Sequence, residues 1–191
     1  GTTIVDINSA SAAQLVAAQQ RAQAGADALA VSVPGVAALL CFADCTPVII
    51  VSPTGRFVVA HAGWRGVVGN IAVLSAQRLA QADGACGTDQ VRANLGGYNV
   101  YIGPHIHACH FEVGQDVADT FRSRFGATCI EGQRHASMLD ALRTSLVATG
   151  VDAARICDAG ICTQCNPQAY YSYRASGGTC GRHGAVAFRK A

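Results

Sequence analysis

Residues 36–64 read VAALLCFADCTPVIIVSPTGRFVVAHAGW, and this segment is the most informative part of the chain about its fold. Two runs of apolar residues, 48–51 and 57–60, flank a turn signal at 53–55 that consists of proline, threonine and glycine. Such a pattern predicts a β-hairpin, and the apolar run at 36–42 predicts another strand that leads into it. Because these runs do not alternate with polar residues, we expect the strands to be buried on both faces.

The rest of the chain shows local patterns of both helices and strands. We expect strands at 2–7, 26–31, 100–102, 154–161 and 185–189, and helices at 11–23, 67–82, 116–125 and 138–149. Gly25, Gly84 and Gly150 follow three of these helices and fit helix C-termini. No internal repeat or low-complexity linker divides the 191 residues. The sequence therefore predicts a single α/β domain, in the broad α+β sense, with a mixed β-sheet and helices packed outside it.

The composition restricts the classes of partner. Half of the residues are hydrophobic, 14% are charged and the net charge is only +2, which does not suggest a nucleic-acid-binding surface. The apolar runs are too short for a membrane-spanning helix. Nine cysteines are an odd number, and the first residues, GTTIVDINSA, do not resemble a secretory leader. We therefore expect reduced thiols, a cytoplasmic location and small-molecule partners, with no nucleic acid and no membrane.

The hairpin brings a cysteine and a histidine together. With Thr54 at the centre of the turn, His61 faces Pro47, and Cys45 is its diagonal neighbour on the same face. Diagonal neighbours lie roughly 7–8 Å apart, so a thiolate and an imidazole could converge on one ion. Zinc suits this pair, but a catalytic zinc needs a third protein ligand from elsewhere. The alternative is a structural cysteine beside a core histidine with no ligand role.

The residues after this histidine favour a binding pocket. The run HAGWRG, at 61–66, places an aromatic residue, Trp64, and a cation, Arg65, immediately beside the possible ligand. A guanidinium suits oxyanions, so an anion or substrate clamp next to the metal is the hypothesis that this run supports.

Five segments in order resemble the laccase-domain, or YfiH-type, family over nearly the whole chain. They are FADCTPVIIV, VVAHAGWRGVVGNI, YIGPHIHACHFEVGQDV, ICTQCNPQAYYSYRASGG and GRHGAVAF. The family was first described as multicopper polyphenol oxidases, and its members are now regarded as purine nucleoside phosphorylases that also deaminate adenosine and cleave methylthioadenosine. The resemblance implies these activities here, with purine nucleosides and phosphate as partners.

The resemblance also implies a metal site, usually of zinc, with copper possible. Its ligands would be the cysteine of the ADC motif, Cys45, the histidine of HAGWRG, His61, and a histidine of an earlier Q-x-H-G motif. No histidine precedes His61 in this chain, and Gly1 resembles the glycine of that earlier motif. We therefore expect the third ligand directly before Gly1, in an N-terminal segment that this chain lacks.

Other residues near these motifs are candidates for the reaction. Asp44 precedes the ligand cysteine and could orient the site or transfer protons, although a strand-end cap is the alternative. Arg65, Arg174 and Arg182 could contact phosphate or ribose, and Arg65 is the preferred choice. Trp64 and Tyr173 could stack on a purine, or pack as ordinary core aromatics.

Two further groups of cysteine and histidine residues could bind metal. His105, His107 and Cys109 alternate along the chain and could share one face. The second group has the spacing C-x2-C-x14-C-x2-H, close to that of a zinc ribbon. Its members are Cys162, Cys165, Cys180 and His183. The resemblance gives neither group a metal-binding role, so both stay alternatives to the hairpin site.

Three other functions are alternatives to purine nucleoside chemistry, and the first of them fits the sequence poorly. A copper-dependent polyphenol oxidase needs a blue copper and a separate cluster held largely by histidines, which six scattered histidines cannot supply. A metal-free hydrolase would use His61 to deprotonate Cys45. A non-catalytic binding module would use the same pocket without turnover.

Overall fold

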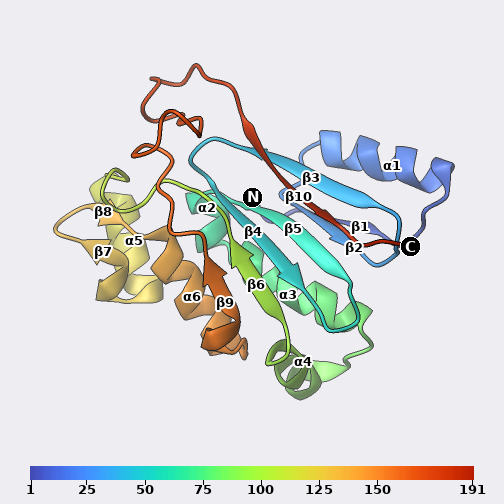
Figure 1. The fold of residues 1–191 in the computed structure, drawn as a ribbon. Coiled ribbons are helices and arrows are strands. Elements are labelled where there is room, and N and C mark those ends of the chain that lie inside the picture. The colour runs from blue at the N-terminus through green and yellow to red at the C-terminus, as the bar shows by residue number, and fades with distance from the viewer.

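A mixed β-sheet forms the centre of the molecule in the computed structural model, which describes residues 1–191. Six strands lie in the order β1-β2-β5-β4-β6-β9 (Figure 1). Their bounds are β1 (Ile4–Ile7), β2 (Ala28–Val31), β4 (Thr46–Val51), β5 (Phe57–Ala62), β6 (Asn99–Ile102) and β9 (Ile156–Asp158). The two edge pairs, β1 with β2 and β6 with β9, are parallel, and the pairs between them are antiparallel. The predicted mixed α/β fold is therefore confirmed.

Six α-helices surround this sheet. They are α1 (Ala12–Gln23), α2 (Trp64–Val68), α3 (Ile71–Ala82), α4 (Gly87–Leu95), α5 (Gln115–Phe125) and α6 (Met138–Thr149). Short 3-10 turns, η1 (Ala127–Cys129) and η2 (Ala153–Arg155), and a small hairpin of β7 (Ile130–Glu131) and β8 (His135–Ala136) complete this region. None of the helices is both long enough and apolar enough to cross a bilayer.

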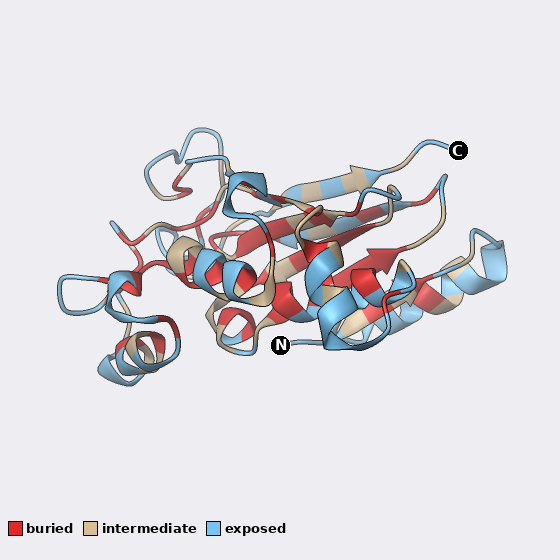
Figure 2. Cartoon of the chain, turned by 90° about the horizontal axis from the view of Figure 1, so that it is seen from below, coloured by how far each residue is buried: buried red, intermediate tan, exposed pale blue.

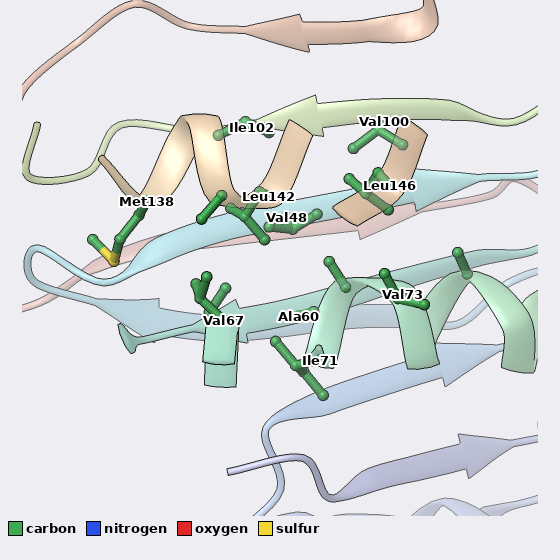
Figure 3. Close-up of a cluster of buried hydrophobic side chains, with 14 of the residues drawn as sticks. Val48, Ala60, Val67, Ile71, Val73, Val100, Ile102, Met138, Leu142 and Leu146 are labelled. Atoms are coloured by element: carbon green, nitrogen blue, oxygen red, sulfur yellow. The ribbon is translucent and has the colours of Figure 1, made fainter. Parts of the chain in front are cut away.

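The larger core lies between the sheet and helices α2, α3, α5 and α6. Figure 3 shows Val48 and Ala60 of the central hairpin facing Ile71 of α3 and Leu142 of α6. Alternate residues of the same strands, such as Val59, face the other side and join a smaller core with α1. The sheet is thus buried on both faces, as Figure 2 shows by its red strands, which is why strands β2, β4 and β5 have continuous apolar sequences.

A second, two-stranded sheet covers part of the smaller core. In it, β3 (Ala37–Phe42) pairs antiparallel with β10 (His183–Phe188). The predicted burial of both faces is wrong for β3, because Leu39 is 56% exposed while its neighbour Ala38 is buried. The physical reason is that β3 is an outer layer, so only its inner face has a strand to pack against. Between β3 and β4, Asp44 has a φ of 79°, and the chain turns there instead of continuing as one strand.

Several other boundaries differ from the expected ones. The predicted helix at 67–82 is divided into α2 and α3 at Asn70, whose φ of 62° is left-handed and cannot continue a helix. Helix α4 was not expected, because it is polar and has only one buried residue, Leu95. The strand expected at 154–161 is only three residues long, β9, because the chain leaves the sheet at Ala159 to form a loop.

Candidate active site

The predicted register of the central hairpin is confirmed, because Pro47 of β4 pairs with His61 of β5. Cys45 lies just before β4, and Gly63 just after β5. A β-carbon added to Gly63 would lie 3.2 Å from Cys45 Sγ and 3.6 Å from His61 Cε1. The thiol and the imidazole therefore converge on the space that the missing side chain of Gly63 leaves open.

These two side chains line a cavity of about 330 Å³. Its walls are formed by Cys41, Ala43, Asp44, Cys45, His61, Ile106, Phe111, Tyr173, Arg174 and Arg182. The structure thus brings five of the expected site residues together with Arg182, whereas Trp64 and Arg65 do not line this cavity. A larger hollow of about 600 Å³ lies between α1 and strands β1 to β3, but no ionisable side chain lines it. The smaller cavity is the one that a thiol, an imidazole, a carboxylate and two guanidinium groups line together.

Asp44 connects this cavity to the C-terminal loop. It is 7% exposed, and its carboxylate accepts hydrogen bonds from Thr163 Oγ1 at 2.6 Å, Ser172 Oγ at 3.0 Å and the backbone N–H of Arg174 at 2.7 Å. The left-handed backbone of Asp44 aims the carboxylate at these donors, and aspartate tolerates that conformation better than most residues. The aspartate therefore holds loop residues 163–174 against the hairpin.

Two arginines of the C-terminal loop reach the cavity. Arg174 donates to the backbone oxygen of Glu112 at 2.9 Å, and its guanidinium carbon lies 5.5 Å from the ring centre of Phe111. Arg182 lies 5.9 Å from the ring centre of Tyr173. Two cations and two aromatic rings therefore stand along one wall, an arrangement that suits an anionic group and a flat ring.

The third arginine stands apart from this wall. Arg65 is exposed at the start of α2, and its guanidinium carbon lies 4.4 Å from the ring centre of Trp64. Trp64 in turn is half-buried and packs against the larger core. The aromatic and the cation of HAGWRG therefore contact each other outside the cavity wall.

Burial sets the protonation of the convergent pair. It raises the pKa of the Cys45 thiol, to which the negative charge of Asp44 adds, and the positive charge of Arg182 opposes this only in part. Burial also lowers the pKa of His61, and the negative charge of Asp27, which raises this pKa, offsets the effect only in part. At neutral pH the pair is a thiol and a neutral imidazole, and not the thiolate and imidazolium of an activated cysteine nucleophile. A neutral imidazole is the form that binds metals.

The N-terminus lies beside this pair. The amino group of Gly1 forms an ion pair with Asp27 at 3.0 Å, and its charge contributes to the pKa values of both Cys45 and His61. The backbone oxygen of Gly1 also approaches Gly66 of α2, lying 3.1 Å from where a β-carbon would stand. A cysteine sulfur and an imidazole, converging beside an open space, fit a zinc or copper ion, since a bound metal ion displaces the proton of a coordinating thiol.

Residues 1–190 match the family model described as multi-copper polyphenol oxidoreductase laccase. The chain belongs to this laccase-domain family. Among curated relatives, it is 34% identical over 180 residues to adenosine deaminase RL5 from an unknown prokaryotic organism, covering 90% of this chain and 65% of that protein. It is 33% identical over 168 residues to purine nucleoside phosphorylase YlmD of Geobacillus stearothermophilus, and this match covers 83% of this chain and 58% of that protein. The chain thus spans about three fifths of the length of these relatives.

Solved structures of the laccase-domain family have the same fold. The crystal structure of YlmD from Geobacillus stearothermophilus superimposes with a TM-score of 0.79 at 31% identity, covering all of this chain and 71% of that one. The crystal structure of YfiH from Bacillus licheniformis gives a TM-score of 0.77 at 27% identity, and this superposition covers 86% of this chain and 62% of that one.

The structure regroups the other cysteine and histidine residues. His183 lies 6.4 Å from Phe42 by ring centres, away from Cys162 and Cys165, so the ribbon-like spacing does not form a cluster. The rings of His105 and His107 are 4.6 Å apart, but Cys109 does not join them. Cys109 lies beside Cys162 and Cys165 instead, together with His110, which belonged to neither of the two predicted groups. The sequence patterns did not reveal this group, because the adjacent pair Cys109 and His110 lies far along the chain from the C-x2-C motif of Cys162 and Cys165.

Proposed function

We propose that this chain is the core of a metal-dependent purine nucleoside phosphorylase that also deaminates adenosine. Its substrates would be inosine, guanosine, adenosine and methylthioadenosine, with phosphate as co-substrate. The observation that carries the proposal is the convergence of Cys45 and His61 on a cavity whose wall holds two arginines and two aromatic rings. The names of the relatives, adenosine deaminase and purine nucleoside phosphorylase, support the choice of substrate class.

Cys45 and His61 would hold the metal, for which zinc is the first choice and copper the second. As third ligand we propose a histidine directly before Gly1, because the N-terminus lies beside both side chains. A bound zinc would supply Lewis-acid activation of water for attack on carbon 6 of adenine. In that reaction a carbon–oxygen bond forms, the carbon–nitrogen bond to the amino group breaks, and ammonia leaves.

The residues of the cavity wall fit phosphorolysis. A phosphate oxygen must attack carbon 1′ of the ribose while the glycosidic bond breaks and the purine leaves with a proton. Arg174 and Arg182 would hold the phosphate by charge-assisted hydrogen bonds, and Tyr173 would stack on the base. Asp44 would position Arg174 through the hydrogen bond that its carboxylate accepts from the backbone. Arg65 and Trp64 are the weaker choices, because they do not line the cavity.

Two rivals use the same cavity. A Cys–His hydrolase would need Cys45 as a thiolate, and the raised pKa of its thiol does not favour that form. A binding module would take up a nucleoside without converting it. We further propose a cytoplasmic location, which agrees with all nine cysteines being free thiols.

The test measures adenosine deamination and inosine phosphorolysis by the zinc-loaded chain and by the chain extended with one histidine before Gly1. An alanine-extended chain is the matched control for the extension. We expect the histidine-extended chain to bind zinc more tightly and to be the most active, since a third ligand completes the zinc site. The variants Cys45→Ala and His61→Ala should lose at least about 100-fold in kcat/KM. Cys157→Ser, an exposed cysteine on β9, should stay within about twofold of the parent.

Three outcomes would overturn parts of the proposal. If neither chain converts adenosine or inosine although nucleosides bind, the protein is a binding module. If chelation leaves activity intact while Cys45→Ala abolishes it, the metal-free hydrolase is the right mechanism. If Cys45→Ala keeps full activity, the site has been placed wrongly.

A further inference from the structure

Two loops that are far apart in sequence meet at one edge of the sheet. Strands β6 and β9 are parallel neighbours, so the loops that follow them, at 103–114 and 159–182, leave the sheet at the same end (Figure 1). Two backbone hydrogen bonds connect the two loops: His105 N–H donates to Ile161 O at 3.1 Å, and Thr163 N–H donates to His105 O at 3.0 Å. Residues beyond this double hydrogen bond are therefore held at a defined spacing.

Four potential metal ligands gather beyond that point. Cys109 and His110 come from the first loop, and Cys162 and Cys165 come from the second. All four ligand atoms lie within 4.8 Å of one another. We propose that these residues bind a structural zinc ion, at a site separate from the pair of Cys45 and His61.

The distances within the cluster are those of tetrahedral zinc. Zinc–sulfur bonds of about 2.3 Å and zinc–nitrogen bonds of about 2.0–2.1 Å place tetrahedral ligands about 3.8 Å apart for two sulfurs and about 3.5 Å apart for sulfur and nitrogen. Cys109 Sγ lies 3.8 Å from both Cys162 Sγ and Cys165 Sγ. The Nδ1 atom of His110 lies 3.2, 3.8 and 3.4 Å from the sulfurs of Cys109, Cys162 and Cys165. A disulfide, with sulfurs about 2.05 Å apart, does not fit these distances.

The environment of Cys162 supports a thiolate ligand. Its sulfur accepts a hydrogen bond from the backbone N–H of His107 at 3.4 Å, and the backbone N–H groups of Gln164 and Cys165 also point to it. Amide donors around a ligand sulfur stabilise its negative charge and orient it toward the ion. The buried Cys162 and exposed Cys165 also have the C-x2-C spacing common in structural zinc sites.

Three cysteines and one histidine fill all four positions of tetrahedral zinc, so this site is structural and has no open position for a substrate. The site would affect function through the loops that it connects. Phe111 directly follows His110, and Arg174 donates to the backbone oxygens of His110 at 3.4 Å and Glu112 at 2.9 Å. The ion would therefore tie together the two loops that form the wall of the active-site cavity. This inference concerns stability and does not rest on the proposed function.

The test measures zinc by elemental analysis in the full chain carrying both Cys45→Ala and His61→Ala. We expect this variant to retain about one zinc per chain, and cobalt(II) in its place should give the charge-transfer and visible bands of a tetrahedral ion bound by thiolates. Adding Cys162→Ser or Cys165→Ser should weaken zinc binding at least about 100-fold, because losing even a residue that orients a ligand costs 10–100-fold. The control is Cys157→Ser, which changes an exposed cysteine outside the cluster.

A second measurement keeps the proposal testable if Cys162→Ser does not fold. Chelation should lower the Tm of the Cys45→Ala, His61→Ala variant, and zinc should restore it. The same treatment should leave the Tm of the Cys165→Ser derivative of that variant unchanged. The proposal is wrong if the folded double variant binds no zinc, or if Cys165→Ser retains zinc as tightly as its parent. It is also wrong if the freshly purified chain has lost two hydrogen masses and shows a disulfide between Cys109 and either Cys162 or Cys165.

Discussion

At the residue scale, the site depends on backbone conformations that few residues can adopt. Asp44 combines a left-handed φ of 79° with a carboxylate that accepts three hydrogen bonds. An alanine there would lose these bonds and would carry a left-handed conformation that costs roughly 1–2 kcal/mol. Gly63 matters for the opposite reason, since its backbone is ordinary and only its missing side chain leaves room for Cys45 and His61.

The role proposed for Arg182 can be tested by comparing two reactions, of which only phosphorolysis uses phosphate. We expect Arg182→Ala to raise the KM for phosphate about 10- to 100-fold, because a lost charge-assisted hydrogen bond costs about 1.5–3 kcal/mol. Adenosine deamination, which uses no phosphate, should change by less than about threefold. Arg65→Ala is the matched control outside the cavity wall, and steady-state kinetics of both reactions provides the measurement. Equal losses in the two reactions, or a larger effect of Arg65→Ala, would remove the assigned role of Arg182.

At the element scale, the central hairpin is anchored at its turn as well as in its strands. Asp83, at the end of α3, accepts hydrogen bonds from Thr54 in the turn at 2.7 Å and from Arg56 at 2.8 Å. Tyr98 donates its hydroxyl to the same carboxylate. One carboxylate thus connects the turn, α3 and the segment before β6, and this anchor lies at the opposite end of β4 and β5 from Cys45 and His61.

This anchor should make stability depend on pH. Burial raises the pKa of Asp83, but the hydrogen bonds from Tyr98, Thr54 and Arg56 lower it by more, so the net pKa is below its usual value. A lowered folded-state pKa stabilises the fold above about pH 4, and this contribution is lost as the pH falls through the folded-state pKa. We expect Asp83→Asn to reduce the free energy of unfolding at pH 7 by about 2 kcal/mol and to flatten its dependence on pH below 4.

Urea denaturation between pH 3 and pH 7 measures both effects. The control is Asp89→Asn, an exposed aspartate on α4, which should change the free energy of unfolding by less than about 0.5 kcal/mol. A parallel shift of the whole pH profile by Asp83→Asn, with an unchanged slope below pH 4, would contradict the role of its charge.

At the scale of the whole molecule, the two faces of the sheet are unequally covered. Seven of the 12 residues of α3 are buried, whereas α1, also of 12 residues, buries only Ala18. The core on the side of α3 contains 33 buried residues, and the core on the side of α1 contains nine. The stabilisation from apolar burial is therefore concentrated on one face.

This asymmetry predicts local opening of α1. We expect the amides of α1 to exchange with solvent through an opening of lower free energy than those of α3, β4 and β5. Leu79→Ala should lower the exchange free energy of the whole core by about 2–5 kcal/mol, while Leu15→Ala should affect mainly α1. Hydrogen exchange with mass spectrometry at increasing denaturant provides the measurement. If α1 and α3 exchange with the same free energy, the molecule opens as a single unit.

Local sequence is sufficient to specify the central hairpin and its register. A turn at 53–55 between two apolar runs places His61 opposite Pro47, and the two-residue period of a strand then brings Cys45 to the same face. These relations are local, because they span fewer than 20 residues and depend only on strand geometry. The apolar sequences of β4 and β5 likewise indicated a sheet buried on both faces.

The residues that surround that hairpin depend on tertiary contacts. The parallel pairing of β6 with β9 brings Cys109 and His110 to Cys162 and Cys165, and no periodicity in the sequence encodes a contact between residues more than 50 positions apart. That Arg174 and Arg182 line the cavity, whereas Arg65 does not, also depends on the path of the C-terminal loop, which Asp44 holds in place. Local patterns determine where strands form, but the order of strands in a sheet determines which loops become neighbours.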